Sequence, residues 1–379
     1  MIEYFQVIKL PFGTEPIDLW IVDGKITYSD PGSASRKPTK GYIVPGLVDC
    51  HAHITVDTGQ KGLPNGSREL VDANRNDHLA SGALLLRDMG LFEAEPPVLI
   101  SVEGLPRVIP VSRYIAPEDF DAPGTPSLPI VTPPEDLTKV ALEQVKAGAR
   151  WVKIFADWPP APGNNLVPEK GLCPDWGSDE LNYTATQLAP AVNAIHKAGA
   201  RVAVHNFSRE GSAASIQAGV DSLEHGWELD ESLLEEVANK GIAWTPTLAM
   251  APSLASTAES CNKPEVASWI KQCMDRLKES KLLQKAVEMN VTILAGTDFI
   301  APGSIPDEIM ALYEFGLDTT TAIAAATSAA RAYLNQSSLD EGGPADFVLY
   351  DEDPRVNLEV IRRPNLIVAG GQKAVAGSK

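Results

Sequence analysis

Four short segments that lie far apart in the sequence carry side chains that could bind one metal ion together. They are the His-Ala-His motif at 51–53, His205, His225 and Asp298, and each falls where a predicted buried strand ends. Side chains alternate between the two faces of a strand, so two histidines separated by one residue point the same way. Neutral imidazoles and a carboxylate are ligands that zinc and similar ions take in proteins. The pattern therefore predicts a metal site.

The same alternation predicts which side chains face the inside of a barrel. Asp49, His51 and His53 should share one face of their strand. Leu223 should share a face with His225, and His205 should point inward in the same way at the tip of the strand RVAVH. In a barrel of parallel strands, chemistry is placed at the C-terminal ends of the strands.

Lys153 lies in the apolar run WVKIFAD, on the strand face that it shares with Trp151 and Phe155. A lysine inside a barrel is costly unless it has a partner or loses its proton. A neutral lysine can react with carbon dioxide to form a carbamate, whose two oxygens can bridge two cations. The alternative is an ion pair between Lys153 and an acidic neighbour such as Asp157.

Asp298 closes the run TILAGTD, where a carboxylate can bind a metal and accept a proton from bound water as a general base. The alternative is that Asp298 caps the helix that follows. We expect His78 and His196 to be surface residues of helices, and Arg87 and Asp88 to form an ion pair at the rim of the barrel.

The elements that must position these residues form a repeating pattern. Between residues 46 and 340, eight short apolar runs alternate with helical stretches, several of which end in Ala-Gly just before the next run. This alternation predicts a closed parallel (β/α)8 barrel. Residues 1–45 and 341–379 contain short strands, including a hairpin around Asp23-Gly24, and we expect them to combine into one small β unit.

Two long proline-rich loops follow the third and fourth runs, and loops of that length are usually functional lids or binding loops. Arg113 and Tyr114 should lie at the mouth of the third strand and Trp158 at that of the fourth. Arg113 could bind a substrate carboxylate, with Tyr114 or Trp158 forming a wall of the pocket. The alternative is an ion pair between Arg113 and Glu118.

The composition limits the class of protein. Hydrophobic residues make up 44% of the 379 residues and the formal charge is −18, which speaks against nucleic acid or an anionic membrane as a partner. The first residues lack a basic segment followed by an apolar run, so we expect no signal peptide, and no apolar stretch reaches roughly 20 residues. The four cysteines have no paired spacing. We expect a cytoplasmic enzyme with a small-molecule substrate. The sequence is compatible with a monomer or with a homo-oligomer.

Taken together, the motifs resemble those of the amidohydrolase superfamily. The matching segments are PGLVDCHAH, RDMG, WVKIF, VAVH, AGVDSLEHG, LAGTD, AIAAATSAARAYL and GGPADFVLYDEDP, and they span nearly the whole chain in the expected order. Within that superfamily the chain resembles the imidazolonepropionase-like and prolidase-like branch, which includes Xaa-Pro and Xaa-Arg dipeptidases. The resemblance implies a metal-dependent (β/α)8 TIM barrel with a small β-sandwich built from both termini.

The resemblance also implies roles for individual residues. His51, His53 and Asp298 would hold the more buried of two divalent metal ions, which we expect to be zinc. His205 and His225 would hold the more exposed one, and carboxylated Lys153 would bridge the two. The implied reaction is hydrolysis of a linear or cyclic amide by a hydroxide that bridges the metals, with Asp298 as the general base.

One segment departs from the prolidase-like pattern. Many relatives carry Gly-Gly-His-Gly after the third strand, whereas this chain has VSRYIAPEDFDAPG, without a histidine. We therefore expect a substrate pocket that differs from the dipeptide pocket. A lactonase or phosphotriesterase on the same binuclear site is the alternative activity, and a metal-free scaffold protein is a third possibility.

Overall fold

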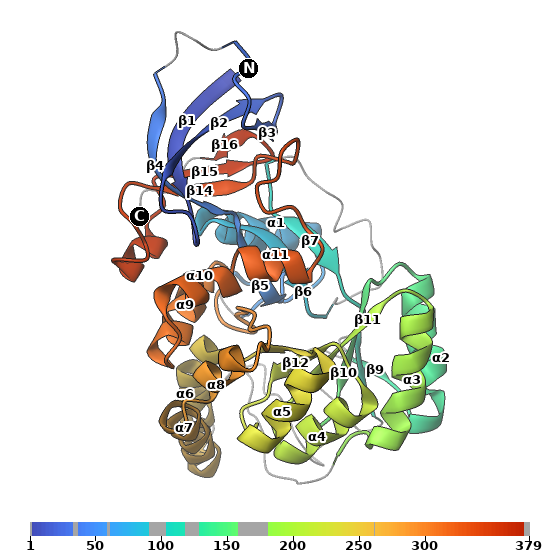
Figure 1. Ribbon diagram of the computed structural model, residues 1–379. Coiled ribbons are helices and arrows are strands. Elements are labelled where there is room, and N and C mark those ends of the chain that lie inside the picture. The colour runs from blue at the N-terminus through green and yellow to red at the C-terminus, as the bar shows by residue number, and fades with distance from the viewer. Residues whose placement is uncertain are drawn as a thin grey trace.

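The structure is a computed structural model of the chain, and it describes residues 2–32, 37–58, 61–90, 104–117, 129–157, 181–260 and 262–374. Figure 1 shows a sheet at one end of the molecule and, below it, further strands with helices packed around them. The strands of both chain ends lie in the upper sheet, beside each other, although more than 300 residues separate them in sequence.

The upper sheet has seven strands in the order β16-β15-β14-β4-β1-β2-β3. They are β1 (Ile2–Lys9), β2 (Pro16–Val22), β3 (Lys25–Thr27), β4 (Thr39–Pro45), β14 (Phe347–Tyr350), β15 (Leu366–Ala369) and β16 (Gln372–Ala374). Asp23 and Gly24 connect β2 to β3 with φ angles of 50° and 76°, the left-handed values that a two-residue hairpin turn requires. The predicted hairpin is confirmed.

The two faces of this sheet pack against different cores. One face carries a cluster of its own, in which the rings of Phe5 and Phe347 meet edge to face at 5.3 Å. The other face contributes Val44, Val348 and Tyr350 to the large core that also holds the helices below. The described strands of the two termini thus form one mixed sheet, and the expected sandwich of two sheets is not found among them.

The strands below are parallel and form two sheets. Six of them pair in the order β13-β12-β11-β10-β8-β9 and three in the order β5-β6-β7. Their bounds are β5 (Leu47–Ala52), β6 (Ala83–Asp88), β7 (Arg107–Pro110), β8 (Tyr114–Ala116), β9 (Pro129–Val131), β10 (Trp151–Phe155), β11 (Arg201–Asn206), β12 (Ser222–His225) and β13 (Ala243–Thr245).

The expected closed barrel is therefore present only in part. Between β7 and β10 the backbones meet in a single bridge, Val111 with Trp151. The predicted eighth strand, VTILAGTD, has one bridge to β13 at Ile293, and on its other side Ala295 O accepts a hydrogen bond from Cys50 N of β5 at 2.9 Å. The described residues thus form an α/β fold of parallel sheets rather than one continuous eight-stranded sheet.

Helices follow most of these strands and cover their outer side (Figure 1). The α-helices are α1 (Arg68–Ala80), α2 (Leu137–Lys146), α3 (Ala185–Lys197), α4 (Arg209–Ala218), α5 (Glu231–Lys240), α6 (Ala251–Ser260), α7 (Pro264–Glu279), α8 (Leu282–Glu288), α9 (Ile305–Glu314), α10 (Thr319–Ala325) and α11 (Ser328–Tyr333). Three 3₁₀ turns are η2 (Pro134–Asp136), η3 (Leu248–Met250) and η4 (Leu358–Arg362). Ser208 caps α4 through Gly211 N, and Gly219 ends it with φ 82°.

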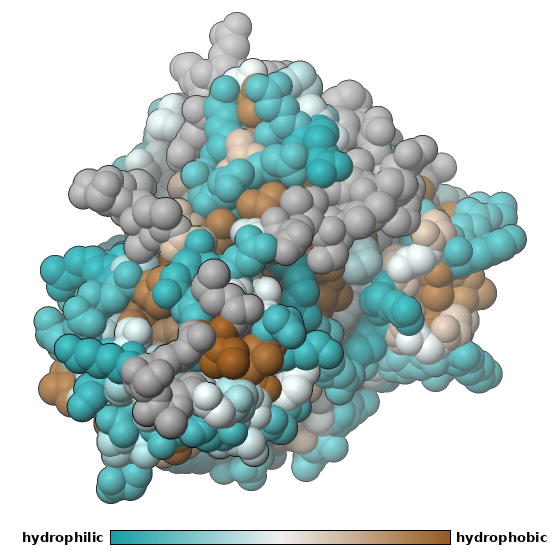
Figure 2. Space-filling view, turned by 90° about the horizontal axis from the view of Figure 1, so that it is seen from above, coloured by the Kyte–Doolittle hydropathy of each residue, from teal (hydrophilic) through white to brown (hydrophobic). Residues whose placement is uncertain are grey.

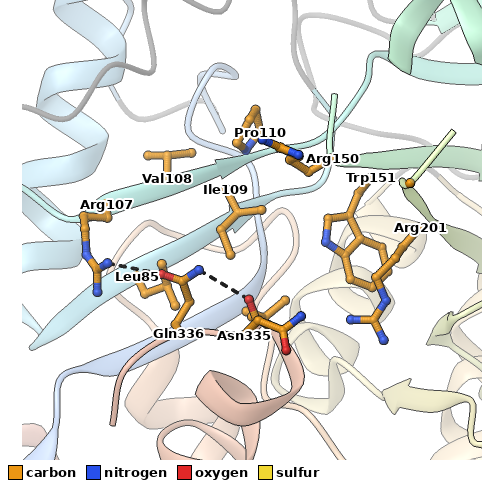
Figure 3. Close-up of a pocket in the computed structure, with 12 residues that line it drawn as sticks. Leu85, Arg107, Val108, Ile109, Pro110, Arg150, Trp151, Arg201, Asn335 and Gln336 are labelled. Carbon is orange, nitrogen blue, oxygen red and sulfur yellow. Dashed lines mark hydrogen bonds between the residues drawn. The ribbon is translucent and has the colours of Figure 1, made fainter. Parts of the chain in front are cut away.

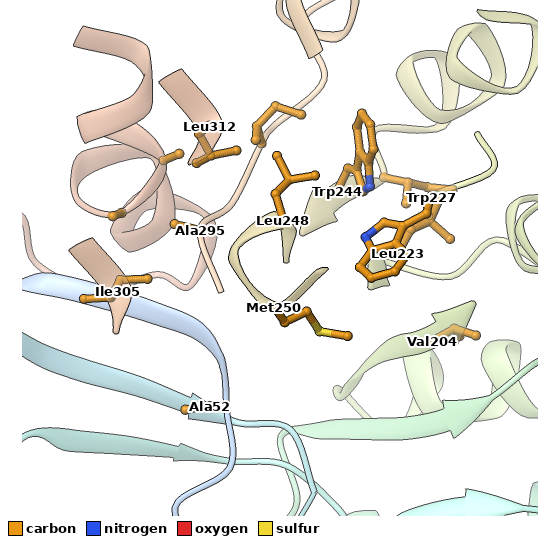
Figure 4. Packing of buried hydrophobic residues seen from close by; sticks show 14 of the residues in the cluster. Ala52, Val204, Leu223, Trp227, Trp244, Leu248, Met250, Ala295, Ile305 and Leu312 are labelled. Atoms are coloured by element: carbon orange, nitrogen blue, oxygen red, sulfur yellow. The ribbon is translucent and has the colours of Figure 1, made fainter. Parts of the chain in front are cut away.

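Two hydrophobic clusters fix the strands that carry the candidate site. Outside the strands, Trp227 and Trp244 are fully buried beside Leu223 and Leu248 (Figure 4). The second cluster lies between the strands, and we call it the enclosed cluster; its buried members are Val48, Cys50, Leu85, Met89, Val111, Trp151, Ala203, Ala243, Leu294, Ala330 and Leu334. Because close-packed interiors resist displacement, the strand ends above this cluster are held in place.

The surface agrees with the charged composition. Figure 2 shows one face that is mostly hydrophilic, with separate hydrophobic patches. None of the helices in the described ranges combines the length and the apolar composition that crossing a bilayer requires. Cys50 and Cys273 are buried free thiols, while Cys173 and Cys261 lie outside the described residues.

Candidate metal centre

Imidazole rings from three segments surround the carboxylate of Asp298 at the C-terminal ends of the parallel strands. Asp298 Oδ1 lies 2.9 Å from His53 Nε2 and 3.5 Å from His51 Nε2, and Asp298 Oδ2 lies 3.7 Å from His225 Nε2. The ring centroid of His205 lies 4.5 Å from that of His225. All five side chains are buried. Within the described residues, His51, His225 and Asp298 offer ligand atoms within 4.8 Å of one another.

The strand that carries His51 and His53 does not alternate as expected. The pairing of β5 with β6 has a register irregularity between Asp49 and Ala52. As a result Cys50 belongs to the enclosed cluster, although His51 next to it also points at Asp298. The expectation that Asp49, His51 and His53 simply share one face is wrong. The irregularity inserts one extra residue into β5 and so interrupts the alternation of its side chains.

The strand that carries His225 shows a second departure. Leu223 packs in the outer hydrophobic core, so the inward face of β12 belongs to Ser222 and Glu224. His225 reaches the site because its own φ is 70°, a left-handed value that breaks the alternation. The expectation that Leu223 and His225 share an inward face is therefore wrong. Asp298 also has a positive φ, of 57°, so both residues are held in conformations that are uncommon outside glycine.

Hydrogen bonds to the outer ring nitrogens set the tautomers of two histidines. His51 Nδ1 lies 2.8 Å from Glu224 Oε2, a carboxylate that can only accept, so we assign the proton to Nδ1. His225 Nδ1 lies 2.7 Å from Thr247 Oγ1, whose own proton goes to Pro246 O, so this Nδ1 is the donor too. In both rings Nε2 is left with a lone pair that faces the carboxylate of Asp298.

Glu224 and Arg87 form a buried ion pair that the sequence interpretation missed. Arg87 Nη2 lies 2.9 Å from Glu224 Oε1, and both side chains are 0% exposed. Burial by itself raises the pKa of Glu224, but the Arg87 guanidinium and the hydrogen bond from His51 hold that pKa below its ordinary value. The expected rim pair of Arg87 with Asp88 is wrong, because Arg87 points between the strands. The only sequence signal for Glu224 was its charge within the predicted strand SLEH, next to the candidate ligand His225.

Lys153 lies beside the same histidine. Its Nζ is 3.5 Å from His51 Nε2 and 5.6 Å from the centre of the Phe155 ring, and the side chain is buried. Burial lowers the pKa of Lys153 to about 8. The alternative partner Asp157 instead accepts hydrogen bonds from Phe207 N and from Ser208 N and Oγ. A fraction of the Lys153 side chains is therefore present as the neutral amine near physiological pH.

The proposed substrate contacts of the third strand lie in different surroundings. Tyr114 is 3% exposed, and its hydroxyl lies 3.0 Å from His53 Nδ1. Gly90 makes room for this ring, because a Cβ atom there would lie 1.7 Å from Tyr114 Cε1. Arg113 is partly buried next to it. Trp158 and Glu118 fall outside the described residues.

Phenylalanine rings shield three of the histidines. Phe299 stacks on His53 at 4.2 Å, Phe155 on His205 at 4.4 Å and Phe207 on His225 at 4.4 Å between ring centroids. These rings keep the imidazoles in an apolar environment. Burial accordingly lowers the pKa of His51 to about 4 and holds the pKa values of His205 and His225 well below their ordinary value. His51, His205 and His225 are therefore neutral, the form that binds metal ions.

The backbone around Asp298 is fixed by Asp49 and by a close contact. Asp49 accepts hydrogen bonds from Thr297 N and Oγ1, and Asp298 N donates to His51 O at 2.6 Å. Glycine is required at position 296, where a Cβ atom would lie 2.5 Å from that of His51. Burial alone would raise the pKa of Asp298, but the neighbouring His51, His53 and His225 hold it well below its ordinary value.

The two remaining histidines differ in position. His196 lies on the surface of α3, as expected, with Nε2 2.8 Å from Asp221 Oδ2. His78 is 2% exposed and accepts a hydrogen bond from Gly303 N, so its expected surface position is wrong. The reason is that α1 packs against the loop that follows Asp298.

Glu308 fixes the turn after Thr247, the residue whose hydroxyl contacts His225 Nδ1. This buried residue of α9 accepts hydrogen bonds from Leu248 N and Ala249 N, directly after Thr247, whose φ is 49°. Burial raises the pKa of Glu308 from its ordinary 4.5 to about 8.

This pKa predicts a pH-dependent stability. The unfolded chain loses the Glu308 proton near pH 4.5 and the folded chain near pH 8, so the folded state holds more protons in between. Raising the pH from 5 to 8 should therefore lower the free energy of unfolding, by up to about 1 kcal/mol per pH unit. Urea titrations of metal-free protein should show this slope, and Glu308→Gln should flatten it. Parallel pH profiles of the two proteins would contradict the assignment.

The donor set fits a divalent metal ion. The Nε2 lone pairs of His51 and His225 converge on a carboxylate, and His225 Nε2 is buried without a hydrogen-bond partner in the described part of the chain. Three acceptors facing each other repel unless a cation lies between them. Imidazole nitrogens and a carboxylate oxygen are the ligands of zinc and related ions.

Comparison with known proteins agrees with this geometry. Residues 176–377 match the profile of the amidohydrolase family. An uncharacterized protein of Mycobacterium tuberculosis is 31% identical over 361 residues, which cover 94% of this chain and 91% of that protein. The ochratoxinase of Aspergillus niger is 25% identical over 367 residues, covering 86% and 73% of the two chains.

Among solved structures, a Xaa-Pro dipeptidase with bound methionine in its active site superposes with a TM-score of 0.78. The alignment covers 98% of this chain and 99% of the dipeptidase, at 20% sequence identity. At that identity the likeness describes the fold, and it agrees with the resemblance drawn from the sequence motifs.

Proposed function

This chain belongs to the amidohydrolase family and is a hydrolase of carbon–nitrogen bonds, and from that premise we propose that it hydrolyses the amide bond of a small molecule at a binuclear metal centre. The proposal keeps the expected barrel, with residues 46–340 as its catalytic unit and residues 1–45 with 341–379 as a flanking β unit. A cytoplasmic location is part of the same proposal.

The observation that carries the proposal is the orientation of the ring nitrogens. Glu224 and Thr247 take up the outer Nδ1 protons, so the Nε2 lone pairs of His51 and His225 are aimed at Asp298. Such outer partners fix the ring orientation and raise the basicity of the ligand. His53 would complete the buried site with His51 and Asp298, and His205 would join His225 at the second.

The proposed chemistry divides between the ions and the residues. When bound, divalent ions would lower the pKa of a coordinated water to roughly 7 and polarise the scissile carbonyl. Asp298 would accept the proton of the attacking water and deliver it to the leaving nitrogen. Its low pKa keeps it ionised and able to accept. The apolar rings of Phe155, Phe207 and Phe299 would exclude bulk water.

A panel of substrates tests the reaction class. Hydrolysis of N-acyl amino acids or cyclic amides, with slower turnover of lactones and phosphotriesters, supports the proposal. The reverse preference would support the alternative hydrolase on the same ligands. Amides with and without a free carboxylate belong in the panel, because we propose that Arg113 binds a substrate carboxylate. Equal kcat/KM for both kinds of amide would contradict that role.

Lys153 gives a direct test of the second metal. We propose that the neutral amine attacks carbon dioxide and loses a proton, and that the resulting carbamate would help to hold two divalent ions, which we expect to be zinc. Protein prepared with bicarbonate should contain two metal equivalents by elemental analysis. Lys153→Ala should retain one equivalent and recover the second when a small carboxylic acid such as propionate is added. Lys197→Ala, at the exposed end of α3, is the matched control and should keep both. One equivalent or less in the unchanged protein would refute the binuclear centre.

A further inference from the structure

A hollow of about 540 Å³ opens at the other end of the strands from the metal-centre residues. Its wall includes all of β7, which begins at Arg107, and the first residues of β10 and β11, Trp151 and Arg201. The candidate ligands lie at the opposite, C-terminal ends of the strands, and the enclosed cluster fills the space between. The hollow is therefore separate from the proposed catalytic site.

The hollow lies where β7 has no paired strand on one side. β10 begins at Trp151, which forms a bridge with Val111, the residue after the end of β7, and Arg150 N donates to Pro110 O at 3.3 Å next to it. Within the described residues β7 therefore pairs only with β6, and Figure 3 shows its side chains beside Arg150, Trp151 and Arg201. The size of the hollow lies within the range of about 300–1,000 Å³ that is usual for small-molecule sites.

The lining is cationic in a strongly anionic protein. Arg107, Arg150 and Arg201 all contribute to it, together with the amides of Asn335 and Gln336, and no Asp or Glu occurs among the lining residues. In Figure 3, Arg107 and Arg201 lie on opposite sides of the view and Arg150 lies above them. Asp346 and Asp221, which pair with Arg107 and Arg201, are not among the lining residues, so the surface of the hollow is cationic although the whole chain has a formal charge of −18.

Two of the three arginines are held rigidly. Arg107 lies 2.9 Å from Asp346 and donates to Gln336 Oε1 at 3.1 Å, while its buried Nε has no hydrogen-bond partner in the described residues. Arg201 lies against the rings of Trp151 and Tyr333, at 4.7 and 4.2 Å, donates to Tyr333 O, and has its Nε 3.5 Å from Asp221 Oδ1. Donors fixed in advance lose little freedom when a ligand binds.

Arg150 differs from both. It is exposed, and its guanidinium has no hydrogen bond or ion pair with any described residue. Its charge is thus available to a ligand. Val108, Ile109 and Leu334 add an apolar wall beside the three cations.

From these observations we propose that the hollow binds a small organic dianion, a phosphate ester or a dicarboxylate, through Arg107, Arg150 and Arg201. The anionic groups would accept charge-assisted hydrogen bonds from the guanidinium groups, and the organic part would lie against the apolar wall. The proposal does not depend on the substrate of the metal centre.

The test is calorimetric titration of the intact enzyme at low ionic strength with two probes, phenyl phosphate and phthalate. Saturable binding of either probe is expected, and the tighter one identifies the anionic group. Arg150→Met should weaken it about tenfold or more. Lys146→Met, which removes an exposed charge from the end of the preceding helix α2, is the matched control and should leave the affinity unchanged.

Two further results separate the hollow from the metal centre. Binding should persist after the metal has been removed with a chelator, and Arg150→Met should hydrolyse substrate at the unchanged rate. No saturable binding of either probe, equal affinity of Arg150→Met, or loss of binding on chelation would each overturn the proposal.

Discussion

Replacing Asp298 by asparagine should reduce kcat by about 10²- to 10⁴-fold while the fold survives, because an amide cannot accept the proton of the attacking water. The structure makes asparagine the right substitution. Asp298 has φ 57°, which asparagine tolerates better than other residues, and Asp298 N keeps its hydrogen bond to His51 O. Alanine would add backbone strain to the loss of the carboxylate.

The control for this variant is Asp23→Asn. Asp23 has φ 50° in the hairpin between β2 and β3, so it undergoes the same chemical change in the same backbone conformation, far from the metal centre. Its kcat should equal that of the unchanged enzyme. Circular dichroism and metal analysis of Asp298→Asn establish whether it is folded and loaded. Activity of this variant within about tenfold of the unchanged enzyme would rule out Asp298 as the general base.

Glu224→Gln should weaken metal binding by about 10- to 100-fold and lower activity with it, since Glu224 holds the Nδ1 proton of His51. An amide in the same position can present its NH2 group to His51 and so favour the tautomer whose Nε2 is protonated. It also leaves the buried charge of Arg87 without a counter-ion. The readout is the metal dissociation constant, measured by competition with a chelator.

A loss of stability alone must be distinguished from a loss of orientation. Asp346→Asn removes a buried carboxylate that pairs with Arg107 and touches no candidate ligand, so it should lower the melting temperature with metal affinity unchanged. Glu224→Gln should change the affinity even where the protein is fully folded. Equal metal affinity of Glu224→Gln and the unchanged protein would show that Glu224 serves only the buried ion pair.

The sequence by itself predicted which histidines and which aspartate meet at the candidate metal centre, and it predicted an α/β fold with parallel strands. His-x-His, the histidines of VAVH and SLEH and the aspartate of AGTD each close an apolar run, and the structure brings them around Asp298. Their position at the ends of apolar runs was sufficient for this, because the C-terminal ends of parallel strands meet at one edge whatever the details of their pairing. The family assignment from the ordered motifs is confirmed.

Only the tertiary structure decided how these residues are oriented. Period-two alternation predicted that Leu223 faces inward together with His225. In the structure Glu224 faces inward instead, and the left-handed φ of His225 lets its imidazole point inward as well. The register irregularity between Asp49 and Ala52 likewise breaks the alternation of side chains along β5. A single backbone torsion or one extra residue leaves no trace in a hydrophobic pattern, since it follows from the packing of neighbouring strands.

The buried partners were decided in the same way. Arg87 and Glu224 are 137 residues apart, and their pairing depends on strands that lie on different sides of the enclosed cluster. Tyr114 meets His53 because Gly90 leaves room for its ring. The cationic hollow lies where β10 begins only beyond the end of β7. Such features depend on distances between segments that are remote in sequence, which composition, spacing and periodicity do not contain.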